Sequence, residues 1–233
     1  MSSVPRQIIA MGGGGFSMEP ENPRLDRYIL AQAGKSNPSV CFIPPAPWKD
    51  YIERFHAAFA KFECRASDLS FYPPPTADLE SFILEKDIVY VGGGTTKSML
   101  AVWREWNMPA ILKKALEKGV ILSGLSAGGI CWFDWGVTDS IPGALTPLKC
   151  LGFLAGSFCP HFDGEPMRRP EFHRLLKEGK IPAGLAADDG AAVHFIDGKL
   201  ERAVASRPKA MAYQLGIENG EVAERGILPR YLE

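Results

Sequence analysis

A serine stands at the centre of the run GLSAG at 124–128, directly after an apolar strand pattern and before another apolar stretch. This context is typical of a nucleophile elbow, in which small neighbours leave the serine hydroxyl exposed on a sharp turn between a strand and a helix. The chemistry that it favours is attack of Ser126 on an acyl carbonyl, with N–H groups of the helix start facing the developing oxyanion. A glycine-serine turn without chemistry is the alternative.

A second glycine-rich turn, GGGTT at 92–96, also follows a strand pattern and precedes a helix pattern. If this loop lies beside Ser126, the N–H of Gly93 or Gly94 can serve as an oxyanion donor together with the N–H of Ala127. A phosphate-binding loop is not indicated, because no glycine of this turn is directly followed by the Lys-Ser/Thr pair of a P-loop. The glycines at 12–15 fit a tight turn after the first strand and a site-lining role equally well.

A serine nucleophile needs a base, and the chain has four histidines. His161 lies in the run CPHFDGE at 159–165, a loop at the carboxyl end of an expected strand, where open α/β sheets assemble their sites. The other three fit structural or solvent-exposed roles: His56 in an amphipathic run, His173 in a charged helix pattern and His194 in an expected hairpin. We therefore expect His161 to be the base.

The third member of a triad is an acid that orients the imidazole and stabilises its charged form. Asp188 and Asp189 follow a strand pattern at 184–187, so they should reach the same edge of the sheet as the histidine loop. Asp139, in the Thr-Asp-Ser triplet at 138–140, is the rival, although such a triplet more commonly bonds its own backbone in a turn. A thiol hydrolase using Cys131 is a further alternative, but that cysteine should lie inside the helix after Ser126 as an apolar filler.

The elements that must position these residues alternate between short apolar runs and longer amphipathic runs. The alternation predicts an α/β fold, a single three-layer domain over 1–233 whose mostly parallel sheet carries helices on both faces. The expected strands are 7–11, 39–43, 87–91, 120–123, 152–158 and 184–187, and the expected helices are 23–33, 49–61, 96–105, 109–118 and 170–177. Residues 191–196 and 200–205, joined by Asp197-Gly198, predict a C-terminal hairpin.

The composition limits the class of function. Lys and Arg number 26 against 27 Asp and Glu, so no basic excess points to nucleic acid, and no stretch approaches the roughly 18 apolar residues of a membrane span. The five cysteines include no CxxC pair, so neither a metal site nor a disulfide framework is indicated. The expected partner is a peptide or small molecule, with no cofactor, and the absence of an export signal predicts a cytoplasmic location.

Taken together, these motifs resemble a known family. GGGTT at 92–96, GLSAGG at 124–129, TDS at 138–140, CPHFDGE at 159–165 and GLAADDGAA at 184–192 are similar, in this order, to the peptidase E and cyanophycinase family of serine peptidases. The similarity covers roughly residues 85–195 and is weaker in the N-terminal third. It implies a flavodoxin-like fold of the class I glutamine amidotransferase type.

The resemblance also implies roles for single residues. It places the nucleophile on Ser126, the base on His161 and the oxyanion glycine on Gly93 or Gly94. The acid of the family is usually a glutamate, and the aligned position here is Asp189, one methylene shorter, with Asp188 and Asp139 as alternatives.

The resemblance implies a serine exopeptidase or dipeptidase acting on short peptides, with aspartyl dipeptides among the candidate substrates and a homodimer as the candidate assembly. Thr95 stands where peptidase E has an asparagine, and Arg168 and Arg169 follow the histidine loop, so these three are the candidate substrate-binding residues. A solvent-exposed cationic helix start is an equal explanation for the two arginines. A non-catalytic binding module of the same fold is the alternative function.

Overall fold

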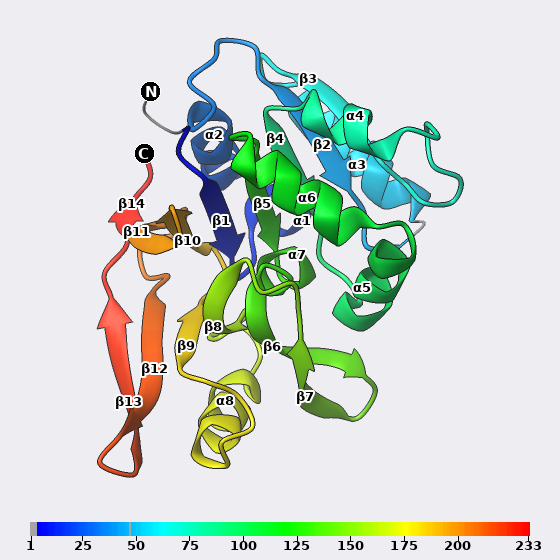
Figure 1. Ribbon diagram of the computed structural model, residues 1–233. Helices are drawn as coiled ribbons and strands as arrows, with labels where there is room; N and C mark the ends of the chain where they lie inside the picture. Colours follow the sequence, from blue (N-terminus) through cyan, green and yellow to red (C-terminus); the bar gives the residue numbers. More distant parts are fainter. Residues whose placement is uncertain (1–3, 47) are drawn as a thin grey trace.

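The computed structural model describes residues 4–46 and 48–233, in which strands and helices alternate through most of the chain (Figure 1). The first part contains β1 (Gln7–Met11), α1 (Gly15–Met18), α2 (Arg24–Ala31), β2 (Ser39–Ile43), α3 (Lys49–Phe59), β3 (Arg65–Asp68), α4 (Leu79–Leu84), β4 (Ile88–Val91), α5 (Thr96–Glu105) and α6 (Met108–Glu117). The second part contains β5 (Ile121–Leu125), α7 (Ala127–Ile130), β6 (Phe133–Ile141), β7 (Ala144–Lys149), β8 (Leu154–Cys159), α8 (Arg168–Lys177), β9 (Gly184–Ala187), β10 (Ala191–Ile196), β11 (Lys199–Ala205), β12 (Ala212–Glu218), β13 (Glu221–Ile227) and β14 (Arg230–Tyr231).

Eight strands form the larger sheet, in the order β14-β11-β10-β1-β5-β4-β2-β3. The strands from β1 to β3 in this order pair in parallel, and β10 and β11 extend the sheet as an antiparallel hairpin beyond β1. Every residue of β2, β4 and β5 is buried, as expected for parallel strands covered on both faces. The carboxyl ends of β1, β4 and β5 therefore meet at one edge, and each of them runs into a glycine-rich turn.

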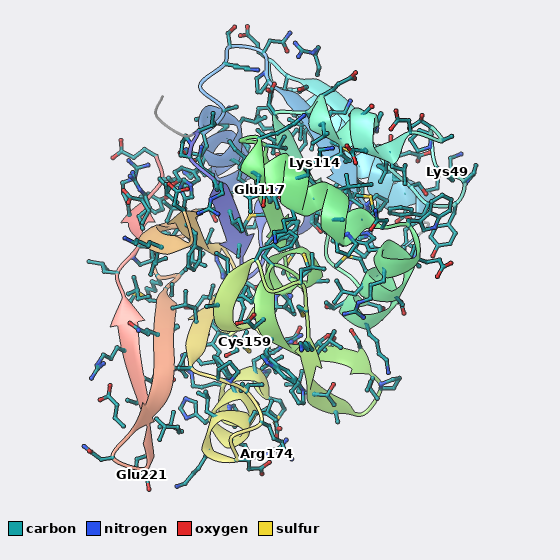
Figure 2. All side chains as sticks on the ribbon, viewed as in Figure 1. Lys49, Lys114, Glu117, Cys159, Arg174 and Glu221 are labelled. Carbon is teal, nitrogen blue, oxygen red and sulfur yellow. The ribbon has the colours of Figure 1, made fainter. Side chains whose placement is uncertain are left out.

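Helices cover both faces of this sheet, and alternate side chains of each strand point into different cores. Ile9 and Met11 of β1 pack in the same core as the buried side chains of α1, α2 and α3. Ile8 and Ala10 pack in the core that contains the buried side chains of α4, α5 and α6. The outer faces of the helices are polar: Lys114 and Glu117 of α6 are exposed, whereas Cys159 at the end of β8 is buried (Figure 2).

A second sheet of six strands, in the order β13-β12-β9-β8-β6-β7, lies in the lower part of the view in Figure 1. Its side chains Phe133, Phe158 and Ala212 share a core with the larger sheet, while α8 covers its other face through Phe172 and Leu175. The two sheets meet at an isolated parallel bridge between Gly13, after β1, and Asp189, after β9. This bridge brings the loops that follow β1 and β9 into contact.

The α/β fold with helices on both faces is confirmed, and each expected strand and helix is present with its ends shifted by a few residues at most. The expected hairpin is also confirmed as β10 and β11. The expectation of one sheet was wrong, because β8 and β9, two of the expected strands, pair with the unexpected strands β6, β7, β12 and β13 in a second sheet. Asn219-Gly220 between β12 and β13 is a hairpin signal that could have revealed half of it. Pro147 explains why the edge strand β7 was not predicted from the sequence, because proline is rare inside strands.

A buried carboxyl group lies beneath the turn that follows β1. Asp26 of α2 is 1% exposed, and Tyr90 donates a hydrogen bond from its hydroxyl to Asp26 Oδ1 at 3.0 Å. Burial raises the pKa of Asp26 from 3.8 to about 7, and the hydrogen bonds from Tyr90 and from the backbone of Phe16 offset only part of that effect. In the unfolded chain the carboxyl group titrates near its ordinary value. The stability that it contributes is therefore fully present below about pH 4 and is lost as the pH rises to 7.

We expect Asp26→Asn to raise the free energy of unfolding at pH 8 by about 2–4 kcal/mol, because a tenfold change in an acid constant is worth about 1.4 kcal/mol and the amide has no charge to bury. At pH 4 the gain should vanish, since both forms are then neutral. Urea unfolding of the two proteins at both pH values measures the difference. A gain of the same size at pH 4 and pH 8 would contradict this explanation.

Candidate active site

Ser126 occupies the turn between β5 and α7. Its backbone has φ 53° and ψ −113°, a conformation that residues other than glycine rarely adopt. The backbone is held there because Ser126 N–H donates to Met11 O at 3.2 Å and Ser126 O accepts the N–H groups of Gly129 and Ile130. Strain maintained by the surrounding structure is a common feature of catalytic positions.

The glycines after Ser126 are needed for close packing. A Cβ atom at Gly128 would lie 2.3 Å from Val91 O, and one at Gly129 would lie 2.8 Å from Met11 O. Any side chain at either position would therefore push α7 away from β4 or β1 and move the serine. The sequence GLSAGG thus has a steric explanation in which the neighbouring strands fix the turn.

His161 and Asp189 form a hydrogen-bonded pair, with 2.6 Å between His161 Nδ1 and Asp189 Oδ1. The side chains are 11% and 19% exposed, so the pair is largely shielded from water. An ionised carboxylate only accepts hydrogen bonds, so Nδ1 carries the proton and Nε2 is left as the basic nitrogen. His161 also has a positive φ of 52°, the second such residue of this site.

The surroundings of Asp189 keep it ionised. Burial acts to raise its pKa, but the hydrogen bond to His161 and the charges of His161, Arg207 and Arg168 outweigh burial, so the pKa lies below its ordinary value. Its backbone N–H donates to Asp163 Oδ1 at 2.8 Å, which ties the acid to the histidine loop.

Two glycines leave room for the carboxylate of Asp189. A Cβ at Gly13 would lie 2.1 Å from its Oδ1, and one at Gly164 would lie 2.3 Å from its Oδ2. The first glycine run therefore contributes Gly13 to the surroundings of the acid.

Ser126 and His161 line one cavity of about 290 Å³ at the carboxyl edge of the larger sheet. Gly93 and Gly94, from the turn after β4, line it as well, so the two glycine-rich turns do lie side by side. The remaining lining residues are Ser17, Met18, Trp48, Asp50, Tyr51, Arg54 and Leu125. A serine on a strained turn, a histidine hydrogen-bonded to a carboxylate and backbone N–H groups in one cavity are the parts that acyl transfer requires.

Comparison with known proteins decides the family. The model of a family described as peptidase family S51 matches residues 8–203. The chain belongs to peptidase family S51. The relationship confirms the resemblance to peptidase E and makes this protein a serine-type peptidase acting on peptides.

Two curated relatives and one crystal structure illustrate the relationship of this S51 peptidase to other proteins. The uncharacterized peptidase YgaJ of Bacillus subtilis (strain 168) is 52% identical over 229 residues, 97% of this chain and 99% of its own. Peptidase E of Shigella flexneri serotype 5b (strain 8401) is 30% identical over 104 residues, 43% of this chain and 44% of its own. The crystal structure of a peptidase from an acI-B1 Actinobacterium has a TM-score of 0.72 at 13% identity, over 98% of this chain and 96% of that one, and it supports the fold alone.

The other candidate acids of this S51 peptidase have different partners. Asp188 is 3% exposed and its Oδ2 accepts from Met211 N–H at 2.9 Å, while burial raises its pKa to about 6. Asp139 is largely exposed on β6, and its ion-pair partner is Arg168, 3.8 Å away. The structure therefore brings Asp189, and neither of these two, to the histidine.

The arginines expected at the substrate do not line the cavity. Arg168 is 1% exposed and donates to Glu165 Oε2 at 2.7 Å and to Val137 O at 2.9 Å, so it holds the start of α8 against β6. The guanidinium of Arg169 lies over the rings of Phe162 and Tyr213. The sequence at the start of α8 does not show that these two arginines pack against other residues, because each has a partner in the second sheet.

Thr95 also lies outside the set of residues that line the cavity. It is the N-cap residue of α5, directly after the turn that contains Gly93 and Gly94. Its position in the sequence predicted a contact with the substrate, but Gly94 is the last residue of this turn that lines the cavity.

Sequence reasoning missed the opposite wall of the cavity. Asp50, Tyr51 and Arg54 come from α3 and Trp48 precedes it, in a run that reads as an ordinary amphipathic helix. Trp48 is 46% exposed. The local signal for a binding surface was the composition of residues 48–54, which contain a tryptophan, an acid, a tyrosine and an arginine at the start of a helix.

Other candidate chemistry finds no support at the described positions. Cys131 is fully buried, and burial holds the pKa of its thiol well above the ordinary value, so it is no nucleophile at neutral pH. Of the other histidines, His56 pairs with Asp68, His173 with Glu224 and His194 with Tyr28. No cluster of three potential metal ligands occurs among residues 4–46 and 48–233. Within the same ranges, none of the helices has the length and apolar character needed to span a bilayer.

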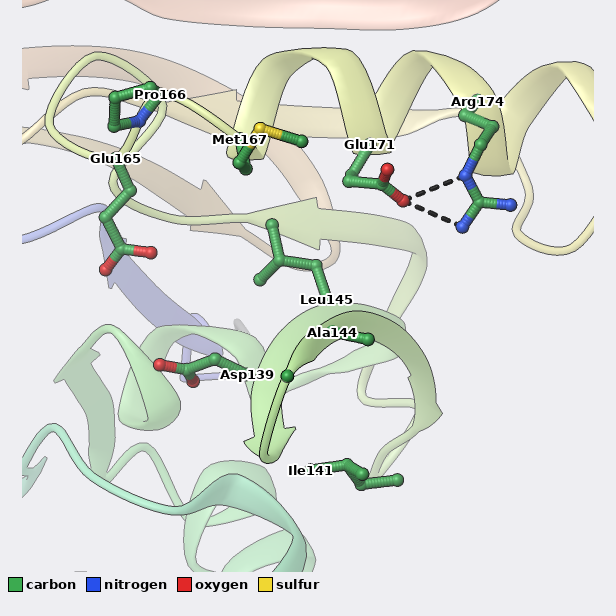
Figure 3. A pocket seen from close by; sticks show the side chains of 10 residues that line it. Asp139, Ile141, Ala144, Leu145, Glu165, Pro166, Met167, Glu171 and Arg174 are labelled. Atoms are coloured by element: carbon green, nitrogen blue, oxygen red, sulfur yellow. Dashed lines mark hydrogen bonds and ion pairs between the residues drawn. The ribbon is translucent and has the colours of Figure 1, made fainter.

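A larger cavity of about 530 Å³ lies between the β6–β7 hairpin and the start of α8 (Figure 3). Leu145 and Met167 line it, and so do Glu171 and Arg174, which form an ion pair. Neither Ser126 nor His161 lines it, so its size alone does not make it the site of the chemistry.

Proposed function

We propose that this S51 peptidase hydrolyses short peptides through a triad of Ser126, His161 and Asp189. The observation that carries the proposal is the 2.6 Å contact between His161 and Asp189 in a pair whose histidine shares a cavity with Ser126. Ser126 Oγ attacks the scissile carbonyl while His161 Nε2 takes its proton and returns it to the leaving amine. Water then attacks the acyl-enzyme, and the same histidine acts as base.

The cavity supports a small substrate. Its volume of about 290 Å³ lies at the lower end of ligand pockets, which hold roughly 300–1,000 Å³. Asp50 and Arg54 line it from one face of α3, and neither forms an ion pair within the described residues. Arg54 Nη2 donates a hydrogen bond to Ser17 O at 2.5 Å. A carboxylate and a guanidinium without ion-pair partners fit the ammonium and the carboxylate of a zwitterionic dipeptide. Aspartyl dipeptides, which carry a second carboxylate, are included in the proposed substrate class.

A fluorophosphonate probe tests the triad. Stoichiometric labelling of Ser126 in the folded protein, located by peptide mass spectrometry, is the expected result, with urea-denatured protein as the control. Labelling no faster than in the denatured control would instead favour a non-catalytic binding module. A dipeptide library, varied on one side of the scissile bond at a time, then identifies the preferred side chains.

We expect Arg54→Ala to raise KM for dipeptides at least about tenfold and to leave kcat within about threefold, because a lost charge-assisted hydrogen bond is worth about 1.5–3 kcal/mol. Arg225→Ala is the matched control, since Arg225 is an exposed arginine of β13 that does not line the cavity. Steady-state kinetics on the best dipeptide of the library measures both variants. An unchanged KM in Arg54→Ala would remove this residue from substrate binding.

Three further proposals concern the whole protein. We propose that residues 1–233 form one catalytic domain, supported by the core that both sheets share. We propose a cytoplasmic location, for which the five free cysteines fit a reducing compartment. The homodimer implied by the resemblance stays a prediction, and sedimentation velocity tests it.

A further inference from the structure

The N–H group of Gly93 already has a partner inside the cavity. It donates to the hydroxyl oxygen of Tyr51 at 3.0 Å, and the Tyr51 hydroxyl in turn donates to Ser17 Oγ at 3.0 Å. All three residues line the cavity that contains Ser126. The N–H of Gly93 is therefore not free to meet an oxyanion directly in this arrangement.

Gly93 lies against the nucleophile. A Cβ atom at this glycine would be 3.4 Å from Ser126 Cβ and 3.1 Å from Leu125 Cδ1. Because the Tyr51 oxygen is within hydrogen-bond distance of Gly93 N, the hydroxyl lies beside the Gly93 turn, in the cavity that Ser126 also lines. The position that an oxyanion would need for a bond to Gly93 is thus taken by a group that is itself a hydrogen-bond donor.

The ring of Tyr51 is held firmly. The residue is 5% exposed, and its ring packs edge-on against Phe42 at 5.1 Å between centroids and beside Phe16 at 5.6 Å. The guanidinium of Arg54 lies 5.6 Å from the ring centre. Burial raises the pKa of Tyr51, so the hydroxyl keeps its proton through the neutral range.

We propose that the hydroxyl of Tyr51 is the oxyanion donor that acts beside the N–H of Ala127, with Gly93 acting through it. This inference rests on the triad proposed above. When the tetrahedral intermediate forms, the Tyr51 O–H turns from Ser17 Oγ to the oxyanion, while Gly93 N–H continues to donate to the Tyr51 oxygen. That second bond polarises the phenol and strengthens its donation. A direct bond from Gly94 N–H stays a separate prediction.

Tyr51→Phe tests the proposal, because it removes the hydroxyl and keeps the ring. We expect kcat to fall about 100-fold, the loss typical of one oxyanion donor, with KM within about twofold. The affinity for a peptide aldehyde, which adds to Ser126 as a tetrahedral hemiacetal, should fall by a similar factor. An unchanged or increased kcat would mean that Tyr51 only covers the Gly93 N–H, and it would overturn the proposal.

Tyr28→Phe is the matched control. Tyr28 is also a buried tyrosine, and its hydroxyl bonds to His194 Nδ1 at 2.7 Å outside the cavity. It should keep kcat, and thermal melting of both variants separates loss of catalysis from loss of folding. An equal fall of kcat in Tyr28→Phe would assign the Tyr51 effect to general destabilisation. Failure of the triad is recognised separately: Ser126 would then resist the fluorophosphonate in the wild-type protein, whereas failure of the Tyr51 inference leaves that labelling intact.

Discussion

Ser126→Ala is expected to lower kcat about a million-fold, to the background rate, because loss of the nucleophile removes covalent catalysis altogether. The fold should survive this change. The Ser126 side chain makes no capping hydrogen bond to α7, and the hydrogen bonds that hold its strained backbone come from main-chain atoms, which alanine retains. Hydrolysis of the best library dipeptide measures the loss, and thermal melting measures stability.

Ser123→Ala is the matched control for this prediction. Ser123 lies three residues earlier in β5, is fully buried and donates to Val89 O at 3.0 Å. Its loss should cost about 1 kcal/mol of stability, the worth of an ordinary hydrogen bond, and leave kcat unchanged. Turnover in Ser126→Ala within tenfold of the wild type would show that another group is the nucleophile.

The parts of the site that the sequence predicted are those that a few consecutive residues specify. The turn at Ser126 needs a strand, small residues and a helix in succession, and all three are visible in a dozen letters. The same holds for the turn at Gly93. Short apolar runs between amphipathic helices likewise predicted the parallel sheet, because such strands are buried on both faces.

What the sequence missed depends on contacts between distant segments. Tyr51 and Arg54 reach the cavity because α3, which covers one face of the larger sheet, begins beside the turn that contains Gly93. Nothing in the sequence of the helix indicates that turn. Arg168 was predicted to be a substrate ligand because β6, the strand against which it is buried, was not predicted. Polar side chains near a catalytic loop therefore need the tertiary structure before they can be assigned to the substrate.

The sequence pattern also does not distinguish between the two neighbouring candidate acids. Asp188 and Asp189 are neighbours in the sequence, and the chain leaves a strand just before them, so pattern alone ranks them equally. The bridge between Gly13 and Asp189 settles which of the two turns toward the histidine loop. Asp188 turns the other way, to the backbone of Met211.

Asp189→Asn is accordingly expected to lower kcat about 10,000-fold while leaving KM nearly unchanged, as replacement of a triad acid does elsewhere. The amide has nearly the shape of the carboxylate, so it fits between Gly13 and Gly164, but it carries no charge to stabilise the imidazolium. It can also present an N–H to His161 Nδ1, which would move the imidazole proton to Nε2 and abolish the base.

Asp188→Asn and Asp139→Asn complete the test, measured with the same dipeptide and checked by thermal melting. If Asp189 is the acid, both should keep kcat within about fivefold, because neither carboxylate contacts His161 among the described residues and loss of a remote charge changes the barrier little. A 10,000-fold loss in either variant, with a mild effect in Asp189→Asn, would move the acid to that position. Only one of the three carboxylates reaches the histidine. The kcat values of the three Asp→Asn variants therefore show which carboxylate orients the base.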